Sequence, residues 1–324
     1  MFGVYLLLLY LTNNIIIRYT INIQRANLVD FFYITDEFCK GFDKTTHFSA
    51  LSQNTSKAKR NKPSKLSTSE VITILMLFHS GNFRNLKHFY LFYVCQHMQS
   101  DFPKQVSYNR FVELQQKAML PLAVFLKTIC LSKCTGISFV DSTKIAVCNN
   151  KRIRRNKVFK GIAETGKSTM GWFHGFKLHL IVNDKGELVN FVITQGNVDD
   201  REPIKNENFL KNVFGKLFAD KGYIGKGLFE MLFINGIQLV TRLKKNMKGA
   251  LMSYADALMI RKRSVIETIN DELKNICQIE HSRHRSFTNF ITNLLSGLVA
   301  YCFFPKKPSI KVEFEQNSSQ LVLF

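Results

Sequence analysis

The chain has 324 residues, of which 46% are hydrophobic and 12% aromatic. This length suffices for one large domain or two ordinary ones, and the apolar content excludes an intrinsically disordered chain. Lysine and arginine number 45 against 24 acidic residues, giving a formal charge of +21 and a pI near 9.7. Such a surplus favours a polyanionic partner, either nucleic acid or an anionic membrane surface.

The cysteine pattern argues against a disulfide framework or a zinc site. Seven cysteines are present, and no two of them form a CxxC pair. Cys130 and Cys134 are four apart, but no second Cys or His pair at zinc-like spacing accompanies them. We therefore expect seven reduced, partly buried thiols, as in a cytoplasmic protein.

Residues 1–25 form an apolar leader of doubtful function. Its two apolar runs, residues 4–11 and 15–17, are separated by asparagines and are too short for a membrane span. No basic residue precedes them, as a secretory signal would require. We expect no stable membrane association, with a cleaved signal or a membrane anchor as the alternative.

The next part of the chain, residues 26–135, has the pattern of a helical domain. A polar, basic linker occupies residues 52–68. Ser67 or Thr68 is a suitable helix cap, with Glu70 in the first turn. Helices are expected over residues 71–79, 83–99, 108–117 and 121–130.

Strand patterns begin at residue 136 and predict an α/β domain over residues 136–305, with a tail at 306–324. Residues 137–147 form the first strand. Residues 176–182 and 188–194 flank a turn signal and predict an antiparallel hairpin. The following elements are expected to be a helix at 203–213, a strand at 216–219, a helix at 228–234, a strand at 237–241, and helices at 257–276 and 287–304. This order indicates a mixed sheet flanked by helices, preceded by the smaller all-helical domain.

Two aspartates stand where metal-dependent phosphodiester chemistry would need them. Paired divalent ions can activate an attacking oxygen and stabilise a leaving one, and hard ions prefer carboxylate ligands. Asp141 interrupts an apolar strand, which is costly unless the carboxylate is paired or binds a cation. Asp220 directly follows the strand at 216–219, at the strand end where α/β sheets place ligands. The structural alternatives are a strand-edge cap for Asp141 and a turn residue for Asp220.

Glu267 is the third candidate carboxylate. On the helix predicted over residues 257–276, one face carries the apolar residues Val265, Ile269, Leu273 and Ile276. Another face carries the charged residues Arg263, Glu267, Asp271 and Lys274. This spacing does not separate a ligand from a solvated face with ordinary ion pairs, and Asp271 and Glu272 are rival carboxylates.

These segments resemble the three signatures of DDE transposases from bacterial insertion sequences. Asp141 lies in FVDST, Asp220 in FADKGYIG and Glu267 in RSVIETINDELK. The last segment resembles the family's Tyr-x2-Arg-x3-Glu-x6-Lys/Arg pattern through Arg263, Glu267 and Lys274, with Ile260 in place of the tyrosine. The similarity covers residues 136–304.

The resemblance implies an RNase H-like catalytic core in which Asp141, Asp220 and Glu267 are the catalytic residues and hold Mg²⁺, with Mn²⁺ as a substitute. It implies binding of terminal inverted repeats, DNA cleavage and strand transfer to target DNA. A homodimer or higher oligomer is expected because two ends must be paired. The protein would be cytoplasmic in a bacterium, and nucleoid-associated when bound to DNA.

Two basic segments border the proposed site. The segment from Lys144 to Lys167 contains eight Lys or Arg residues and one acidic residue. The segment from Arg242 to Arg263 contains seven Lys or Arg residues and one acidic residue. Such segments suit phosphate contacts. The DNA contacts expected are Arg152, Arg154, Arg155, Lys177, Lys221, Lys244, Lys245, Arg263 and Lys274. The last two also suit offsetting the repulsion of the carboxylates.

Three expectations concern residues outside the triad. Asp199 and Asp200, in a segment resembling the family's GN-x-x-D, are expected to cap the next helix rather than bind metal. His174 either faces DNA or is an exposed strand residue. A helix-turn-helix within residues 67–133, with a helix opening at residue 107, is the candidate reader of the DNA ends.

Two other functions are alternatives. An inactive or decayed transposase would act only as a DNA-binding protein or repressor. An RNase H-like nuclease would cleave DNA without joining it.

Overall fold

The computed structural model describes residues 25–51, 64–81, 83–169, 171–242, 252–280, 284–310 and 321–322. Two compact units make up the chain: Met1–Cys130 with Thr288–Lys306, and Leu131–Phe287 with Lys307–Phe324. We call them the helical unit and the sheet unit. By its contacts, α12 (Phe287–Cys302) belongs with the helical unit, although its place in the chain groups it with the strands.

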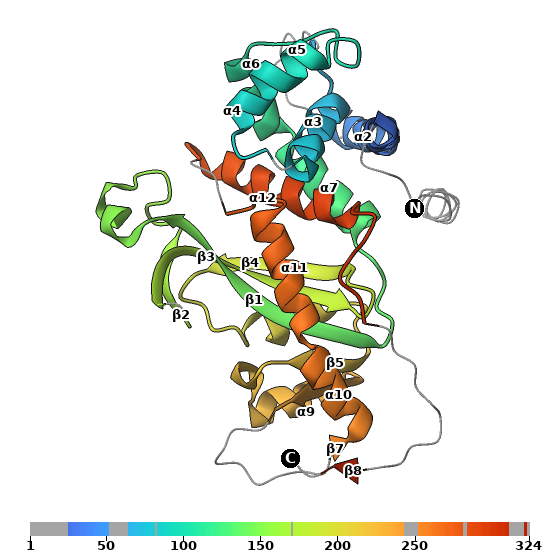
Figure 1. Cartoon of the computed structure of the whole chain (residues 1–324), viewed down its shortest axis with the longest axis vertical. Helices are drawn as coiled ribbons and strands as arrows, with labels where there is room; N and C mark the ends of the chain where they lie inside the picture. The colour runs from blue at the N-terminus through green and yellow to red at the C-terminus, as the bar shows by residue number, and fades with distance from the viewer. Residues whose placement is uncertain are drawn as a thin grey trace. The chain divides into compact units, whose positions relative to one another are not determined.

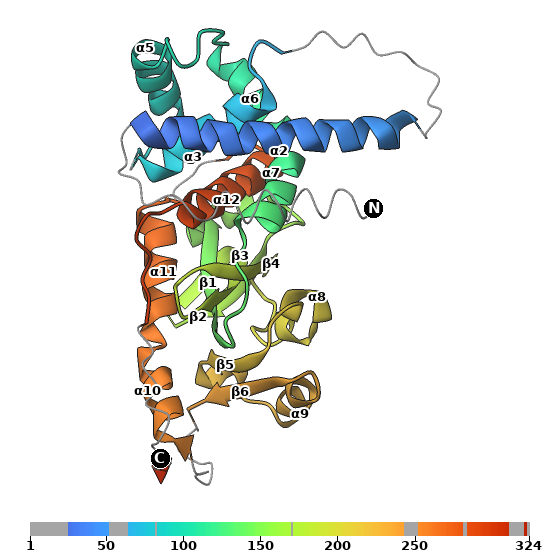
Figure 2. The same ribbon diagram turned by 90° about the vertical axis from the view of Figure 1, so that its right-hand side faces the viewer.

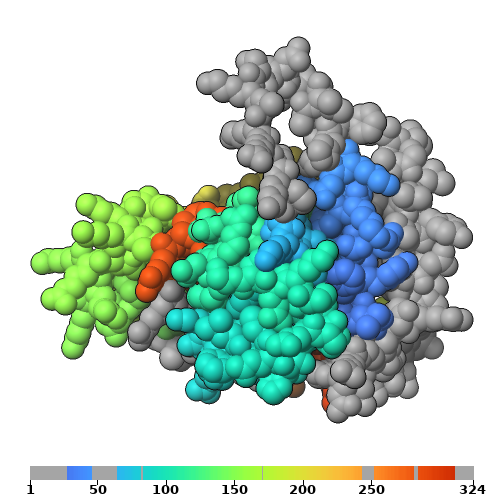
Figure 3. All heavy atoms as spheres, turned by 90° about the horizontal axis from the view of Figure 1, so that it is seen from above, coloured from blue at the N-terminus to red at the C-terminus, as the bar shows by residue number. Residues whose placement is uncertain are grey.

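The helical unit consists of α2 (Arg25–Leu51), α3 (Thr68–Ser80), α4 (Leu86–His88), α5 (Cys95–His97), α6 (Tyr108–Lys117), α7 (Met119–Phe125) and α12. π-Helical turns at Phe89–Val94 and Leu126–Cys130 extend α4 and α7. The helix expected over residues 83–99 is therefore formed by three consecutive pieces. In Figure 3, α2 (blue) lies beside the cyan and teal surface of the segments that follow it.

Local capping explains where two of these helices start. Ser67 Oγ accepts from the backbone N–H of Glu70 at 3.1 Å, and Glu70 Oε2 accepts from the Ser67 N–H at 2.6 Å. This capping box satisfies two backbone donors at the start of α3. The Ser107 hydroxyl likewise caps α6. The predicted starts of both helices are confirmed, and α3 is buried along most of its length.

The sheet unit contains β1 (Ile137–Cys148), β2 (Glu164–Ser168), β3 (Gly171–Asn183), β4 (Leu188–Gln195), β5 (Gly215–Ala219) and β6 (Ile237–Thr241). The strand order is β2-β3-β1-β5-β6, and β4 also pairs with β3. β1, β3 and β4 are antiparallel neighbours, whereas β5 and β6 run parallel to β1. The predicted mixed sheet and its hairpin are confirmed. The polar strand β2 was not predicted, because its sequence ETGKS lacks an apolar alternation.

Helices cover both sides of this sheet (Figure 2). On one side lie α8 (Glu207–Leu210) and α9 (Lys226–Ile234); on the other, α10 (Tyr254–Lys262) and α11 (Ser264–Asn275) run end to end. The apolar core on the α8 and α9 side includes Val140, Leu217 and Leu232. A small second sheet pairs β7 (Met252–Ser253) with β8 (Leu321–Val322).

Two predicted helices differ from the observed ones. The helix expected over residues 257–276 is two helices, α10 and α11, which meet at Arg263. The helix expected over residues 203–213 is a 3₁₀ turn, Pro203–Lys205, followed by the short α8. The Asn206 side chain accepts from the N–H of Asn208 and starts α8 anew, which explains the interruption.

A glycine contact sets the register between the first two parallel strands. Gly215 has a φ of +79°, and a Cβ there would lie 2.4 Å from the carbonyl oxygen of Gly136. The next residue, Lys216, donates its N–H to the same oxygen at 2.8 Å. Glycine at residue 215 thus permits both the left-handed backbone and the close approach that start β5 beside β1.

All seven cysteines are free thiols, as the sequence predicted. Among the described residues, no helix combines the length and the apolar character that crossing a bilayer would require. Residues 1–24 of the apolar leader and most of the basic linker lie outside the described residues.

Candidate active site

Strand register brings the two aspartates to neighbouring positions. β1 and β5 pair in parallel, with Phe139 opposite Phe218. Two residues further along the chain are Asp141, within β1, and Asp220, directly after β5, so the two aspartates follow the last paired residues by the same distance in sequence. Asp220 is exposed and follows the last residue of β5. This is the carboxyl end of a parallel strand, as the sequence predicted.

Asp141 is a mostly buried carboxylate facing the helix α11. Its side chain is 22% exposed. Asn270 on α11 donates from Nδ2 to Asp141 Oδ2 at 3.2 Å, and Arg263 Nη1 lies 3.8 Å from Asp141 Oδ1. Burial raises the pKa of Asp141 to about 6, because the charged form loses water; Arg263 opposes this rise, and the negative charges of Glu267 and Asp220 add to it. The three carboxylates therefore interact electrostatically.

Glu267 lies in the first turn of α11 and is held by an arginine. Arg263 Nη2 donates to Glu267 Oε1 at 2.7 Å, one helical turn apart. The Arg263 side chain is 16% exposed, whereas that of Glu267 is 57% exposed. Arg263 is therefore a cation shared between Asp141 and Glu267. Its position agrees with the predicted role of offsetting carboxylate repulsion.

The donors in this region suit a hard divalent cation. Carboxylate oxygens are the preferred ligands of Mg²⁺, and a bound cation would stabilise the charged form of buried Asp141. In the part of the chain that the structure describes, however, no three acidic, His or Cys side chains are gathered closely enough to surround one ion. Glu267 points to Arg263 instead, so ligation by all three carboxylates requires Glu267 to exchange its partner.

The two aspartates of the GN-x-x-D segment have protein partners. Asp199 accepts hydrogen bonds from the backbone and side chain of Arg201, which hold the pKa of its carboxyl far below the usual range. Asp200 pairs with Lys177 at 2.9 Å. Neither aspartate caps a helix, so the expectation that they cap the next helix was wrong. Both carboxylates instead form ion pairs with side chains of the protein.

The predicted DNA contacts fall into different environments. Arg152, Arg154 and Arg155 lie exposed in a 3₁₀ turn, Asn150–Arg155, that follows β1 (Figure 1). Lys221 is exposed beside Asp220. Lys274 pairs with Glu280 at 3.5 Å. Lys244 and Lys245 lie outside the described residues.

Lys177 and His174, on β3, are less accessible than the strand pattern suggested. The Lys177 side chain is 13% exposed, and its ammonium also donates to the carbonyl of Val198 at 2.8 Å. A DNA contact would require this ammonium to leave two protein partners. His174 is buried and bonded to the hydroxyl of Thr165, so it is not an exposed strand residue.

Asn270 is the site residue that sequence reasoning missed. It lies three residues after Glu267, on the same side of α11, and it contacts Asp141. The signal was available, because residues three apart on a helix are neighbours. The search for metal ligands favours acidic residues, and therefore points to Asp271 and Glu272 and not to the amide of Asn270.

Comparison with known protein families decides what kind of domain this is. Residues 131–287 match the family model described as the transposase DDE domain. This segment is a transposase DDE domain. The match has the same bounds as the first of the two segments that make up the sheet unit, Leu131–Phe287. It contains Asp141, Asp220 and Glu267. DDE transposase domains generally use divalent metal ions.

The whole chain was also compared with solved structures and with curated protein sequences. A cryo-EM structure of the piggyBac transposase synaptic complex with hairpin DNA is similar, with a TM-score of 0.47 and 10% sequence identity. The similarity covers 76% of this chain and 67% of that one. No curated protein sequence matches the chain.

Proposed function

We propose that this protein is a DNA transposase that binds the ends of an insertion sequence, cleaves them and joins them to target DNA. The observation that carries the proposal is the matching position of Asp141 in β1 and Asp220 directly after the parallel strand β5, within a DDE domain. Glu267 completes the set from the helix packed against β1. In this proposal Mg²⁺ is the natural metal, and Mn²⁺ substitutes for it.

The three carboxylates would act as metal ligands in this scheme. When bound, divalent ions activate an attacking oxygen and stabilise a leaving one. Asp141 would offer its oxygens from within β1, and Asp220 from the position directly after β5. Asn270 holds Oδ2 of Asp141 in place, while Oδ1 lies 3.8 Å from Arg263 Nη1 and would exchange that cation for the metal. Arg263 compensates the negative charge while Glu267 is unligated.

The surrounding cations would bind the DNA backbone. Arg152, Arg154 and Arg155 are exposed and lie on one short turn, so they can contact successive phosphates. We assign end recognition to the helical region, residues 26–135, with α6 as the candidate reading helix, and catalysis to residues 136–305. Pairing of two ends calls for a dimer or a larger assembly on DNA in a bacterial cytoplasm.

The test is a cleavage and strand-transfer assay with Mg²⁺ and DNA carrying the ends of the element that encodes this protein. Wild type is expected to release 3′ hydroxyl ends and join them to a target plasmid, whereas Asp141→Asn does neither. Asp271→Asn is the matched control, because that exposed carboxylate is bonded within its own helix to Asn275.

The same assay distinguishes the two alternatives. Cleavage without joining would identify a nuclease. Specific DNA binding with no metal-dependent cleavage in wild type would identify a decayed transposase that only binds DNA. Equal cleavage by wild type and Asp141→Asn would remove the carboxylate from the chemistry altogether.

A further inference from the structure

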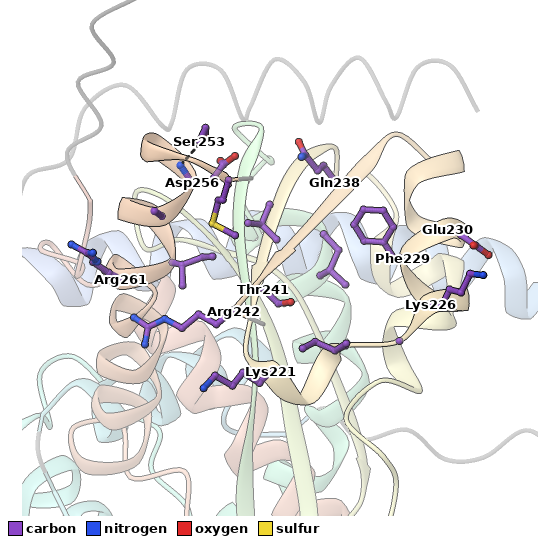
Figure 4. A pocket seen from close by; sticks show the side chains of 17 residues that line it. Lys221, Lys226, Phe229, Glu230, Gln238, Thr241, Arg242, Ser253, Asp256 and Arg261 are labelled. Atoms are coloured by element: carbon purple, nitrogen blue, oxygen red, sulfur yellow. Dashed lines mark hydrogen bonds between the residues drawn. The ribbon is translucent and has the colours of Figure 1, made fainter. Parts of the chain in front are cut away.

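An open pocket of about 1100 Å³ lies in the sheet unit, at the edge strand β6. Its walls come from α9 on one side and α10 on the other, and residues 238–242 run between them (Figure 4). Small-molecule sites usually measure about 300–1,000 Å³, so the pocket is at the large end of that range. It has room for an extended segment of a polymer, and the charge and aromatic character of its lining decide which kind. We call it the β6 groove.

The charge of the β6 groove favours a polyanion. Four exposed cations line it: Lys221, Lys226, Arg242 and Arg261. Within the described part of the chain, no ion pair involves any of the four. The two acids of the lining are Asp256 and Glu230, and Asp256 is already paired with Lys216 at 2.6 Å. The groove therefore offers an excess of unneutralised positive charge.

An aromatic wall and an apolar floor face these cations. Phe229 on α9 lines the groove and is 46% exposed. In Figure 4 its ring stands on the α9 side, while Arg242 and Arg261 extend from β6 and α10 on the other side. Leu239 and Val240 of β6 add apolar surface to the lining. Cations beside an exposed aromatic ring are the elements of a single-strand binding site, in which the ring stacks on bases and the cations hold phosphates.

The groove begins one residue from a proposed catalytic carboxylate. Lys221 is part of its lining and follows Asp220 directly. A strand whose phosphate reaches Asp220 can thus continue past Lys221 into the groove. Duplex DNA would leave the aromatic wall and apolar floor unused, because its base faces are stacked inside the helix. Unpaired bases expose those faces.

We propose that the β6 groove binds single-stranded DNA that extends from the active site, with Phe229 stacking on a base and Lys221, Arg242 and Arg261 contacting phosphates. This inference rests on the proposed function, since it assumes that DNA reaches Asp220. The groove gives the unpaired strand a path separate from the exposed arginines after β1.

The first test measures binding of a short fluorescent oligothymidylate to the whole chain by anisotropy, in EDTA so that no cleavage occurs. Phe229→Ala is expected to weaken binding about tenfold, in keeping with the loss of one stacked base. Phe233→Ala is the matched control: Phe233 lies one turn further on the same helix, is 67% exposed, and does not line the groove. For the cations, Arg261→Gln is compared with its neighbour Lys262→Gln.

Duplex DNA and an acidic peptide serve as competing ligands. Phe229→Ala is expected to leave duplex binding unchanged, and polyglutamate is expected to compete poorly. Equal effects of Phe229→Ala and Phe233→Ala on single-strand binding would overturn the proposal. So would equal losses of duplex and single-strand binding, or full displacement by polyglutamate, which would point to a protein partner.

A second variant guards against a folding defect. Trp172 is the single tryptophan of the chain, so Phe229→Trp in a Trp172→Phe background places one fluorophore in the groove. Stacking on a base should quench it on addition of single-stranded DNA, and an unchanged signal would contradict the proposal. Metal-dependent plasmid nicking, measured in parallel, separates the two hypotheses. If wild type does not nick the plasmid but Phe229→Ala still binds single-stranded DNA more weakly than Phe233→Ala, the proposed function alone is rejected. If wild type nicks the plasmid but the two variants bind single-stranded DNA equally, the groove proposal alone is rejected.

Discussion

Asn270 on α11 donates a hydrogen bond to Asp141 on β1, with 3.2 Å between Asn270 Nδ2 and Asp141 Oδ2. This bond ties the helix that carries Glu267 to the strand that carries Asp141. It also helps to fix the orientation of a largely buried carboxylate, together with the backbone hydrogen bond from Ser142. We infer that Asn270 positions Asp141 for metal binding and does not itself react.

Asn270→Ala should therefore weaken the site more than the fold. A hydrogen bond to a charged group contributes about 1.5–3 kcal/mol, so we expect a comparable loss of unfolding free energy and at least tenfold slower DNA cleavage. Asn270→Asp should not restore cleavage, because it adds a fourth negative charge. Asn275→Ala, on the same helix, should match wild type. Cleavage by Asn270→Ala at the wild-type rate would show that the bond is dispensable.

Gly215→Ala should disrupt the site from a distance. An alanine Cβ would meet the carbonyl of Gly136 at 2.4 Å and would sit on a left-handed backbone. The strain should cost more than about 1 kcal/mol of unfolding free energy and disturb the β1–β5 register that aligns Asp141 with Asp220. Gly222→Ala, where a Cβ has open space, is the control. Thermal denaturation and cleavage rates measure both effects; equal stability of the two variants would be inconsistent with this account.

Local sequence signals predicted most of the fold. The capping residues Ser67 and Ser107, and the apolar runs of β1 and β5, act within a few residues of each other, so they can be recognised in the sequence. The polar strand β2 and the break at Arg263 could not be found in this way. β2 is held by pairing with β3, and the break occurs where Arg263 contacts two carboxylates.

The sequence pointed to the acidic residues of the candidate site but not to the side chains that contact them. Asp141 and Asp220 stood out because a carboxylate next to an apolar strand is unusual. The roles of Asn270 and the engagement of Lys177 depend on pairs 129 and 23 residues apart. Such pairs arise from strand order and helix packing, which no local spacing encodes.

Lys177 and Arg154 should separate stability from DNA binding. Lys177→Met removes a largely buried ammonium from Asp200 and Val198, so unfolding free energy should fall by about 1 kcal/mol with little change in DNA affinity. Arg154→Gln should leave stability unchanged, weaken DNA binding several-fold and reduce the salt dependence by about one phosphate contact. Denaturant titration and binding at several salt concentrations test both. A larger affinity loss in Lys177→Met would mean that Lys177 reaches DNA.

The pH dependence of stability should reflect buried His179. Burial lowers the pKa of this imidazole from 6.5 to about 4, so the unfolded chain binds more protons than the folded one between these values. The stabilisation is complete above pH 6.5 and is lost as the pH falls towards 4, by up to about 3 kcal/mol. His179→Gln should lack this dependence when unfolding is measured across the range. Parallel curves for the two proteins would contradict the shift.

Asp141 should affect the pH dependence of stability in the opposite direction to His179, lowering stability as the pH rises. Its pKa is raised to about 6, so its contribution is present below about pH 3.8 and is lost as the pH rises through 6 in metal-free protein. Asp141→Asn should therefore gain stability relative to wild type as the pH increases. Added Mn²⁺ should abolish that difference, because a bound cation favours the ionised carboxylate.

Metal binding by the carboxylates is the central claim, and calorimetric titration of the whole chain with Mn²⁺ at neutral pH tests it most directly. Wild type and Asp271→Asn should bind Mn²⁺ with the same affinity, whereas Asp141→Asn and Asp220→Asn should each bind at least about tenfold more weakly. Affinity in Asp141→Asn and Asp220→Asn equal to that of wild type would contradict the account.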